Sequence, residues 1–262
     1  MSKGVEFEVR GDGVALLRVN RPAARNALSW AAQDAFAAGV MAASRNESIR
    51  ALIIAGAGGS FISGGDLKEL SGHPEAAAGV RLNRVMGAAL AQLADLPFPV
   101  IAAVDGDAVG GGCEILTACD LRVASAGARF SFRQVHNALT TGWGGTSRLV
   151  AQIGQSRAME LLLTGRTFDT TEARAIGLIH RVAPPDTVSL DAAYGWAEEL
   201  LQLPRRALAA IKTLVQAAPN LPAPDAYQLE TQLFVDLWPS SDHIEAMNAF
   251  TQKRVPHFNR NL

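Results

Sequence analysis

Short apolar runs alternate with longer Ala-rich or amphipathic stretches over the first half of the chain. The runs at 51–55 and 100–104 carry no polar side chain, which is typical of strands buried on both faces of a sheet. The stretches at 29–44 and 74–93 have helical character, and Ser29 is placed to cap the first of them. Strands separated by helices usually pair in parallel, so the pattern predicts an α/β fold.

The remaining elements follow from the same pattern. Two strands at 5–10 and 14–19 flank the turn Gly11-Asp12-Gly13. We further expect a helix at 111–118, a strand at 121–124, helices at 146–153, 156–163 and 170–176, and a strand at 179–182. Three or four short helices fill the chain from residue 186 onward, and short helices need a partner surface. We therefore divide the chain into a core at 1–195 and a helical region at 196–262 that packs on the core and on neighbouring subunits.

Composition and charge exclude several classes of function. The net charge is -1 over 262 residues, so no excess of either sign favours nucleic acid or an anionic membrane. Cys113 and Cys119 lie on different faces of one predicted helix, which argues against a disulfide, and no Cys/His cluster has metal-ligand spacing. No apolar run has the length of a signal peptide or of a membrane span. We expect a soluble cytoplasmic protein without a metal.

Candidate chemistry lies directly after the apolar run at 100–104. Three glycines, Gly110 to Gly112, precede Cys113 and Glu114 and open a predicted buried helix. Because no side chain covers them, the backbone N–H groups of such a loop can point at a developing negative charge. Glu114 lies in the first turn of the same helix. Oxyanion donors beside a carboxylate indicate chemistry on a carbonyl compound.

Several motifs, taken together, resemble the crotonase superfamily, whose commonest members are enoyl-CoA hydratases and isomerases. They are Asn20-Arg21-Pro22 with Asn26-Ala27-Leu28, Phe61 to Lys68, Gly110 to Glu114 with Ala118-Cys119-Asp120, Gly144-Gly145-Thr146 with Arg148-Leu149, and Leu163-Thr164-Gly165 with Ala173 and Gly177-Leu178. The resemblance runs from about residue 5 to the C-terminus. It implies a spiral core of ββα repeats, a C-terminal helical region that builds a trimer or a dimer of trimers, and a coenzyme A thioester as substrate with no separate cofactor.

The resemblance also implies roles for individual residues. The amides of Gly65 and Gly111 would hold the thioester oxygen. The substrate-binding positions that it implies are Ala24, Arg25 and Ala27 for the CoA moiety, Ser63, Asp66, Leu67, Thr141 and Trp143 around the acyl group, and Phe234 and Lys253 toward the CoA of a neighbouring subunit. Asp66 also precedes a short predicted helix, so we expect its side chain to act as an N-cap. Trp143 stands where hydratases usually carry a small residue, and we expect it to narrow the acyl pocket.

The hydratases place two glutamates around the reacting double bond, and this chain matches only one of them. Glu114 corresponds to the first, whereas Gln134 stands at the position of the second. A glutamine side chain forms hydrogen bonds but accepts no proton at neutral pH. Losing one general acid–base group typically costs ~10²–10⁴ in rate. His136, two residues further on, is a candidate replacement, although a structural role is more common for such a histidine.

Three reactions and one inactive state therefore stay open. Glu114 alone could move a proton between two carbons and so isomerise a double bond. Hydration is possible if Gln134 orients the water and Glu114 carries the proton. Decarboxylation of methylmalonyl- or ethylmalonyl-CoA needs no base, because the departure of CO₂ generates the enolate. A relative that binds CoA esters without turnover is the fourth alternative. All three reactions pass through an enolate-like thioester, which two N–H donors stabilise.

Overall fold

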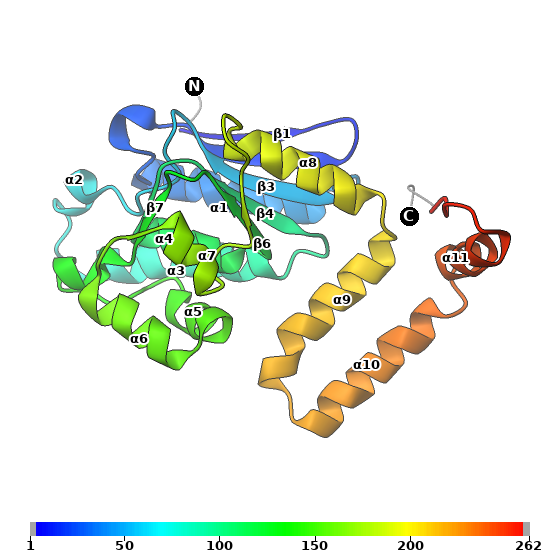
Figure 1. Ribbon diagram of the computed structural model, residues 1–262. Coiled ribbons are helices and arrows are strands. Elements are labelled where there is room, and N and C mark those ends of the chain that lie inside the picture. The colour runs from blue at the N-terminus through cyan, green and yellow to red at the C-terminus, as the bar shows by residue number, and fades with distance from the viewer. Residues whose placement is uncertain (1–3, 259–262) are drawn as a thin grey trace.

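A six-stranded sheet organises the computed structural model, which describes residues 4–258 (Figure 1). Its strand order is β1-β2-β3-β4-β6-β9. The antiparallel pair β1 and β2 lies at one edge, and every other neighbouring pair is parallel. The strands are β1 (Val5–Val9), β2 (Val14–Val19), β3 (Ala51–Gly56), β4 (Val100–Val104), β6 (Leu121–Ala124) and β9 (Arg181–Val182). The predicted α/β fold with parallel strands is confirmed.

Both faces of this sheet are covered, which explains why its central strands β3 and β4 are apolar throughout. Leu17 and Ile54 point into a cluster shared with α1 (Trp30–Arg45) and α3 (Ala76–Ala94). Alternate residues such as Leu16 and Ile53 point to the other face and pack against α8 (Ser189–Leu201). Successive side chains of a strand point to opposite faces, so a strand buried on both sides needs an unbroken apolar run.

A second, three-stranded sheet was not predicted from the sequence. It consists of β5 (Asp107–Val109), β7 (Arg129–Ser131) and β8 (Phe168–Asp169), which are too short to show a periodic pattern. β5 and β7 are parallel, with Val109 opposite Ser131. Parallel neighbours leave a sheet at the same end. The segments that follow them, α4 (Gly111–Ala118) and η2 (Arg133–Asn137), therefore begin side by side.

The helices agree with the predicted ranges to within about two residues. Ser29 caps α1, since its Oγ accepts from the amide of Ala32 at 3.2 Å. Cys113 and Cys119 are both free and buried, as their spacing predicted. The other helices are η1 (Pro22–Ala24), α2 (Leu67–Leu70), α5 (Gly145–Ile153), α6 (Gln155–Thr164), α7 (Thr170–Ala175), α9 (Arg205–Ala217), η3 (Ala218–Asn220), α10 (Ala223–Leu237) and α11 (Ser241–Gln252). No helix in the part of the chain described is both long and apolar enough to cross a membrane.

The last helices extend away from the core (Figure 1). We call residues 205–252, which comprise α9 to α11, the C-terminal arm. Lys212 ties α9 to the core, because its Nζ lies 2.7 Å from the carboxylate of Asp120 and 3.0 Å from the carbonyl oxygen of Phe98. α10 contains no buried residue. The predicted division at residues 195 and 196 falls within α8, and it stays a prediction.

Candidate active site

A cavity of about 1420 Å³ opens among the loops that follow η1, β3, β5 and β7. Pockets for small molecules usually measure about 300–1,000 Å³, so this one has room for an extended ligand. Most of the sequence-predicted site residues line it: Ala24, Arg25, Ala27, Ser63, Gly65, Asp66, Leu67, Gly111, Glu114, Gln134, Thr141 and Trp143. The fold therefore brings these residues, predicted from five separate stretches of sequence, to one place.

Gly65 presents an unused amide to this cavity. Its neighbours are paired with Leu28, because the carbonyl of Gly64 accepts from the Leu28 amide at 2.7 Å and the Asp66 amide donates to the Leu28 carbonyl at 3.0 Å. In an extended segment, successive peptide groups point in opposite directions. The amide of Gly65 consequently points away from Leu28. Among the described residues it has no acceptor.

Gly111 presents a second unused amide. It is the first residue of α4, and the first amides of a helix have no acceptor within the helix. The loop that carries Gly65 lies against it, since a Cβ built on Gly64 would lie 2.8 Å from the nitrogen of Gly111. Two backbone donors from two separate loops thus line the same cavity, and a helix N-terminus adds its partial positive charge to one of them.

Glu114 is buried, and four N–H donors surround its carboxylate. Oε2 accepts from the amides of Trp143 at 2.8 Å and Gly145 at 3.1 Å. Oε1 accepts from Nε2 of Gln134 at 2.9 Å and from the amide of Gly142 at 3.3 Å. An ionised carboxylate offers about four acceptor sites, so all of them are occupied. Oε2 is held by backbone alone, whereas Oε1 depends on one side chain that can rotate.

Gln134 has a fixed amide orientation and a free oxygen. Its Nε2 must face Glu114, because the opposite orientation would put the amide oxygen against the carboxylate. Its Oε1 is buried without a hydrogen-bond partner among the described residues. A buried acceptor left unpaired costs about 1–3 kcal/mol. Gln134 is therefore able to accept from a donor that enters the cavity, such as a water or a polar group of a ligand.

The loop at 142–145 fits closely around Glu114 and Gly111. A Cβ built on Gly145 would lie 2.5 Å from Cγ of Glu114, so a larger residue would displace the carboxylate. The indole of Trp143 lies against Gly111, where a Cβ would come 2.2 Å from its Cζ3. Arg148 stabilises the loop, since its Nη2 donates to the Trp143 carbonyl at 2.7 Å. Burial lowers the pKa of Arg148, and the charge of Glu114 opposes that shift.

One sequence-based expectation in this region is wrong. Asp66 occupies the N-cap position of α2, but its side chain makes no capping bond. It accepts instead from Nη2 of Arg21 at 3.0 Å. The charge of an arginine 45 residues away outcompetes the local amides as a partner.

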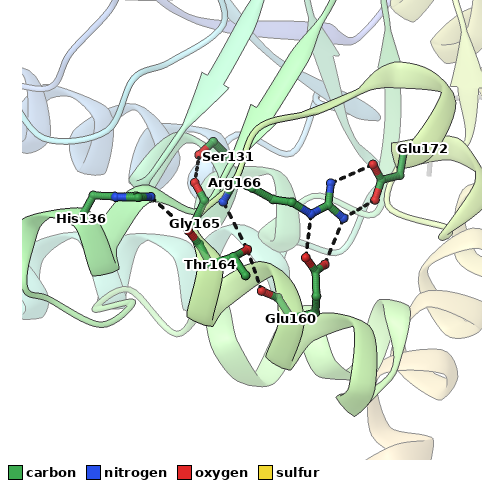
Figure 2. A network of polar contacts seen from close by, with 7 residues as sticks. All are labelled: Ser131, His136, Glu160, Thr164, Gly165, Arg166 and Glu172. Carbon is green, nitrogen blue, oxygen red and sulfur yellow. Dashed lines mark hydrogen bonds and ion pairs between the residues drawn. The ribbon is translucent and has the colours of Figure 1, made fainter.

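His136 makes a structural contact, which is the more common role for such a histidine. It is not among the cavity-lining residues, and its Nε2 lies 3.0 Å from the carbonyl oxygen of Thr164 (Figure 2). It does not replace the missing acid beside Glu114.

Phe234 and Lys253 lie on the C-terminal arm and do not line the cavity of their own chain. Their expected contact with the CoA of a neighbouring subunit stays a prediction. Cys113 lies next to Glu114 in sequence, but burial raises the pKa of its thiol to about 12, which leaves no thiolate for nucleophilic attack. Within the described residues, no three His, Cys, Asp or Glu side chains gather in a metal-binding arrangement.

The sequence analysis missed the donors that hold Glu114. Gly142, Trp143 and Gly145 supply their amides from 28 to 31 residues further along the chain. The motif Gly144-Gly145-Thr146 with Arg148 was the available signal, but its spacing indicates a helix start and not what the helix start binds.

Comparison with known proteins identifies the family of this chain. The family model described as enoyl-CoA hydratase/isomerase matches residues 9–261. The 2,3-dehydroadipyl-CoA hydratase of Escherichia coli K12 is 35% identical over 249 residues, which cover 95% of this chain and 96% of that protein. The human mitochondrial methylglutaconyl-CoA hydratase is 33% identical over 257 residues, which cover 96% of this chain and 75% of that protein. The crystal structure of an enoyl-CoA hydratase from Bacillus anthracis superposes with a TM-score of 0.92 at 29% identity, covering 99% of this chain and 100% of that one. This chain belongs to the enoyl-CoA hydratase/isomerase family and has the crotonase fold.

Proposed function

We propose that this protein acts on acyl-CoA thioesters through an enolate whose oxygen is held by the amides of Gly65 and Gly111. The observation that carries the proposal is that both amides lack an acceptor among residues 4–258 and line one cavity with Glu114. Preorganised donors of this kind favour the species in which the oxygen carries most charge. No cofactor is needed, because coenzyme A is part of the substrate.

The reaction that we propose is hydration of an enoyl-CoA or movement of its double bond. Glu114 carries the proton at Oε1, the oxygen whose partners are Gln134 and the more distant amide of Gly142. When the Gln134 amide turns toward a water or the acyl group, Oε1 gains a free lone pair. Oε2, which accepts from two backbone amides, keeps the carboxylate in place during the transfer.

Decarboxylation of a malonyl-type CoA ester, such as methylmalonyl- or ethylmalonyl-CoA, is a second candidate. The observation that favours it is the complete occupancy of the Glu114 carboxylate by four donors. A carboxylate in that state acts as an anchor for the loop and not as a base. Loss of CO₂ forms the enolate without a base, so the two free amides would suffice.

One experiment separates these readings. The protein is incubated in D₂O with a 2-enoyl-CoA, a 3-enoyl-CoA, methylmalonyl-CoA and a saturated acyl-CoA, and the products are analysed by mass spectrometry. A gain of water by the 2-enoyl-CoA, a shifted double bond, or exchange of deuterium into C2 of the saturated acyl-CoA supports hydration or isomerisation. Release of CO₂ from methylmalonyl-CoA with none of these changes, and with deuterium only at C2 of the decarboxylated product, supports decarboxylation. Binding of all four esters without any turnover or exchange would leave a CoA-ester-binding protein and would end the proposal.

We also propose that the chain forms a homotrimer or a dimer of trimers through the C-terminal arm. The arm exposes large apolar side chains, among them Tyr227, Phe234, Val235, Trp238 and Phe250. Exposed apolar patches of this kind mark association surfaces. In such an assembly Phe234 and Lys253 would contribute to the CoA site of a neighbouring subunit, where a lysine ammonium would favour a CoA phosphate.

A further inference from the structure

Gln134 and His136 leave the same short 3-10 helix, η2, toward different partners. A 3-10 helix has three residues per turn, so side chains two apart in sequence point to different sides. Gln134 reaches Glu114. His136 reaches the turn that ends α6, as Figure 2 shows. None of the five residues of η2 is buried. Burial therefore does not fix this helix, and specific contacts must hold it in place.

The turn at residues 164 and 165 provides those contacts, and we call it the latch. Nε2 of His136 donates to the carbonyl oxygen of Thr164 at 3.0 Å. Gly165 has a φ of +57°, and a Cβ there would lie 2.7 Å from Cδ2 of His136 and 2.9 Å from Cγ1 of Val135. Only glycine allows so close an approach. Ser131, just before η2, donates its Oγ to the Gly165 carbonyl at 2.8 Å.

Ion pairs next to the latch restrict its movement. The guanidinium of Arg166 lies between two carboxylates, with Nε 2.6 Å from Glu160 and Nη1 2.9 Å from Glu172 (Figure 2). These carboxylates belong to α6 and α7, so Arg166 ties the two helices together across the latch. Thr164 is also anchored by its own hydroxyl, which donates to the Glu160 carbonyl at 2.9 Å. A single exposed ion pair contributes little, but a guanidinium shared by two carboxylates restricts the turn.

We propose that His136 is a positioning residue: by holding η2 against the latch, it sets Gln134 where its amide meets Glu114. The inference rests on the proposed function for its effect on rate, but the contact itself does not. Without the His136 contact, η2 can shift along α6. Gln134 is then too far away either to hold Oε1 of Glu114 or to turn from it to the substrate. A displacement of about 1 Å at a reacting centre can cost up to about a hundredfold in rate.

The first test is structural and independent of activity. Crystal structures of the wild type and of the His136→Ala variant are compared at the Gln134 Nε2 to Glu114 Oε1 distance, which is 2.9 Å here. We expect a distance beyond about 3.5 Å in His136→Ala, past the limit of a hydrogen bond. We expect an unchanged distance in His136→Gln, which keeps an N–H donor, and in the control Met159→Ala, an exposed position of α6. A retained 2.9 Å contact in His136→Ala overturns the proposal.

The second test is a double-mutant cycle on kcat. We expect His136→Ala to lower kcat about tenfold with KM nearly unchanged, and to have no further effect in a Gln134→Ala background. A merely structural histidine would reduce kcat by the same factor in both backgrounds, and that result also overturns the proposal. Ser131→Ala, which removes the other side-chain bond to the latch, should act in the same direction as His136→Ala. If the wild type turns over no thioester, the proposed function fails, and the crystallographic distance alone decides the role of His136.

Discussion

Two regions of the molecule differ in how far contacts within the chain satisfy their side chains. They are the cavity wall around Glu114 and the C-terminal arm. The Glu114 carboxylate receives four N–H donors from its own chain, and no acceptor site is left for solvent. In the arm, Tyr227 is 72% exposed and Phe250 is 86% exposed. α11 buries only Ala249, and α10 buries no residue. The cavity wall is complete within one chain, whereas the apolar face of the arm is not.

This difference shows which parts of the sequence are explained by the fold of one chain. Gly145 is required because Cγ of Glu114 occupies the space of a Cβ. No contact among the described residues accounts in the same way for an exposed Phe250. In the assembly proposed above, association with a second copy would bury the apolar residues of the arm. The comparison therefore predicts that changes in the wall affect chemistry and changes in the arm affect assembly.

The largest effect is expected in the cavity wall and concerns the rate of turnover. Glu114→Gln should lower turnover by at least about a hundredfold, because the proton carrier is removed. The affinity for an acyl-CoA should be nearly kept, since the loop at 24–27, which the family resemblance assigns to the CoA moiety, is unchanged. Steady-state kinetics and calorimetric titration measure the two quantities, and a thermal melt checks that the loop at 142–145 still folds. Unchanged turnover would remove Glu114 from the mechanism.

The next largest effect is expected in the C-terminal arm and concerns the number of chains in the assembly. Phe250→Asp should shift the protein from a multi-subunit species to single chains in sedimentation velocity. Burying one phenylalanine side chain contributes about 1.5–3 kcal/mol, so each interface should weaken by about ten- to a hundredfold. Val80→Asp is the matched control, because Val80 is also exposed but lies on α3, outside the arm. An unchanged mass for Phe250→Asp, or a loss of mass for Val80→Asp, would contradict the assignment.

The third prediction concerns Gln134 in the cavity wall and its part in hydration. Gln134→Glu restores a second carboxylate within hydrogen-bond distance of Glu114. Two carboxylates this close share a proton, so one of them becomes an acid at neutral pH. Hydration of a short enoyl-CoA should rise by about tenfold or more. Gln134→Leu, which lacks the amide and the acid, should show no gain. Equal rates for Gln134→Glu and Gln134→Leu would remove this position from the hydration step.

The smallest effect concerns acid stability beside β9, at the edge of the six-stranded sheet. Burial, helped by the charge of Arg122, lowers the pKa of His180 from 6.5 to about 4. The neutral ring is needed as an acceptor, because its Nδ1 receives the Arg122 amide at 3.2 Å. The unfolded chain therefore binds a proton below about pH 6.5 that the folded chain refuses until about pH 4, so stability falls as the pH falls through this window. The fall in urea midpoint between pH 7 and pH 5 should be smaller in His180→Gln than in the wild type. An equal fall in both proteins would show that His180 is not responsible.

Much of the fold, and the glycine loop before Glu114, followed from the sequence for physical reasons, whereas most of the other site residues followed from the family resemblance. The apolar runs of β3 and β4 are unbroken because the sheet is covered on both faces, and Ser29 caps α1 through a local bond. β5, β7 and β8 were missed because two or three residues carry no period. These short strands place α4 beside η2 and thereby bring Glu114 to Gln134. Because the strands were not predicted, only the family resemblance indicated that these two residues meet.

What could not be predicted depends on contacts between distant segments. Asp66 was assigned to the nearest helix start, but its partner is Arg21. His136 was considered as an acid from its sequence position beside Gln134, yet its direction is set by the turn at Thr164 and Gly165. In each case loop closure brings a partner that local spacing does not reveal.

The central claim is that the amides of Gly65 and Gly111 share one oxygen of the substrate. A crystal structure of the Glu114→Gln variant with a bound acyl-CoA tests it most directly. We predict that the thioester oxygen lies about 2.7–3.1 Å from both nitrogens. A thioester oxygen that contacts neither amide, in a complex with the CoA moiety well bound in the cavity, would contradict the account.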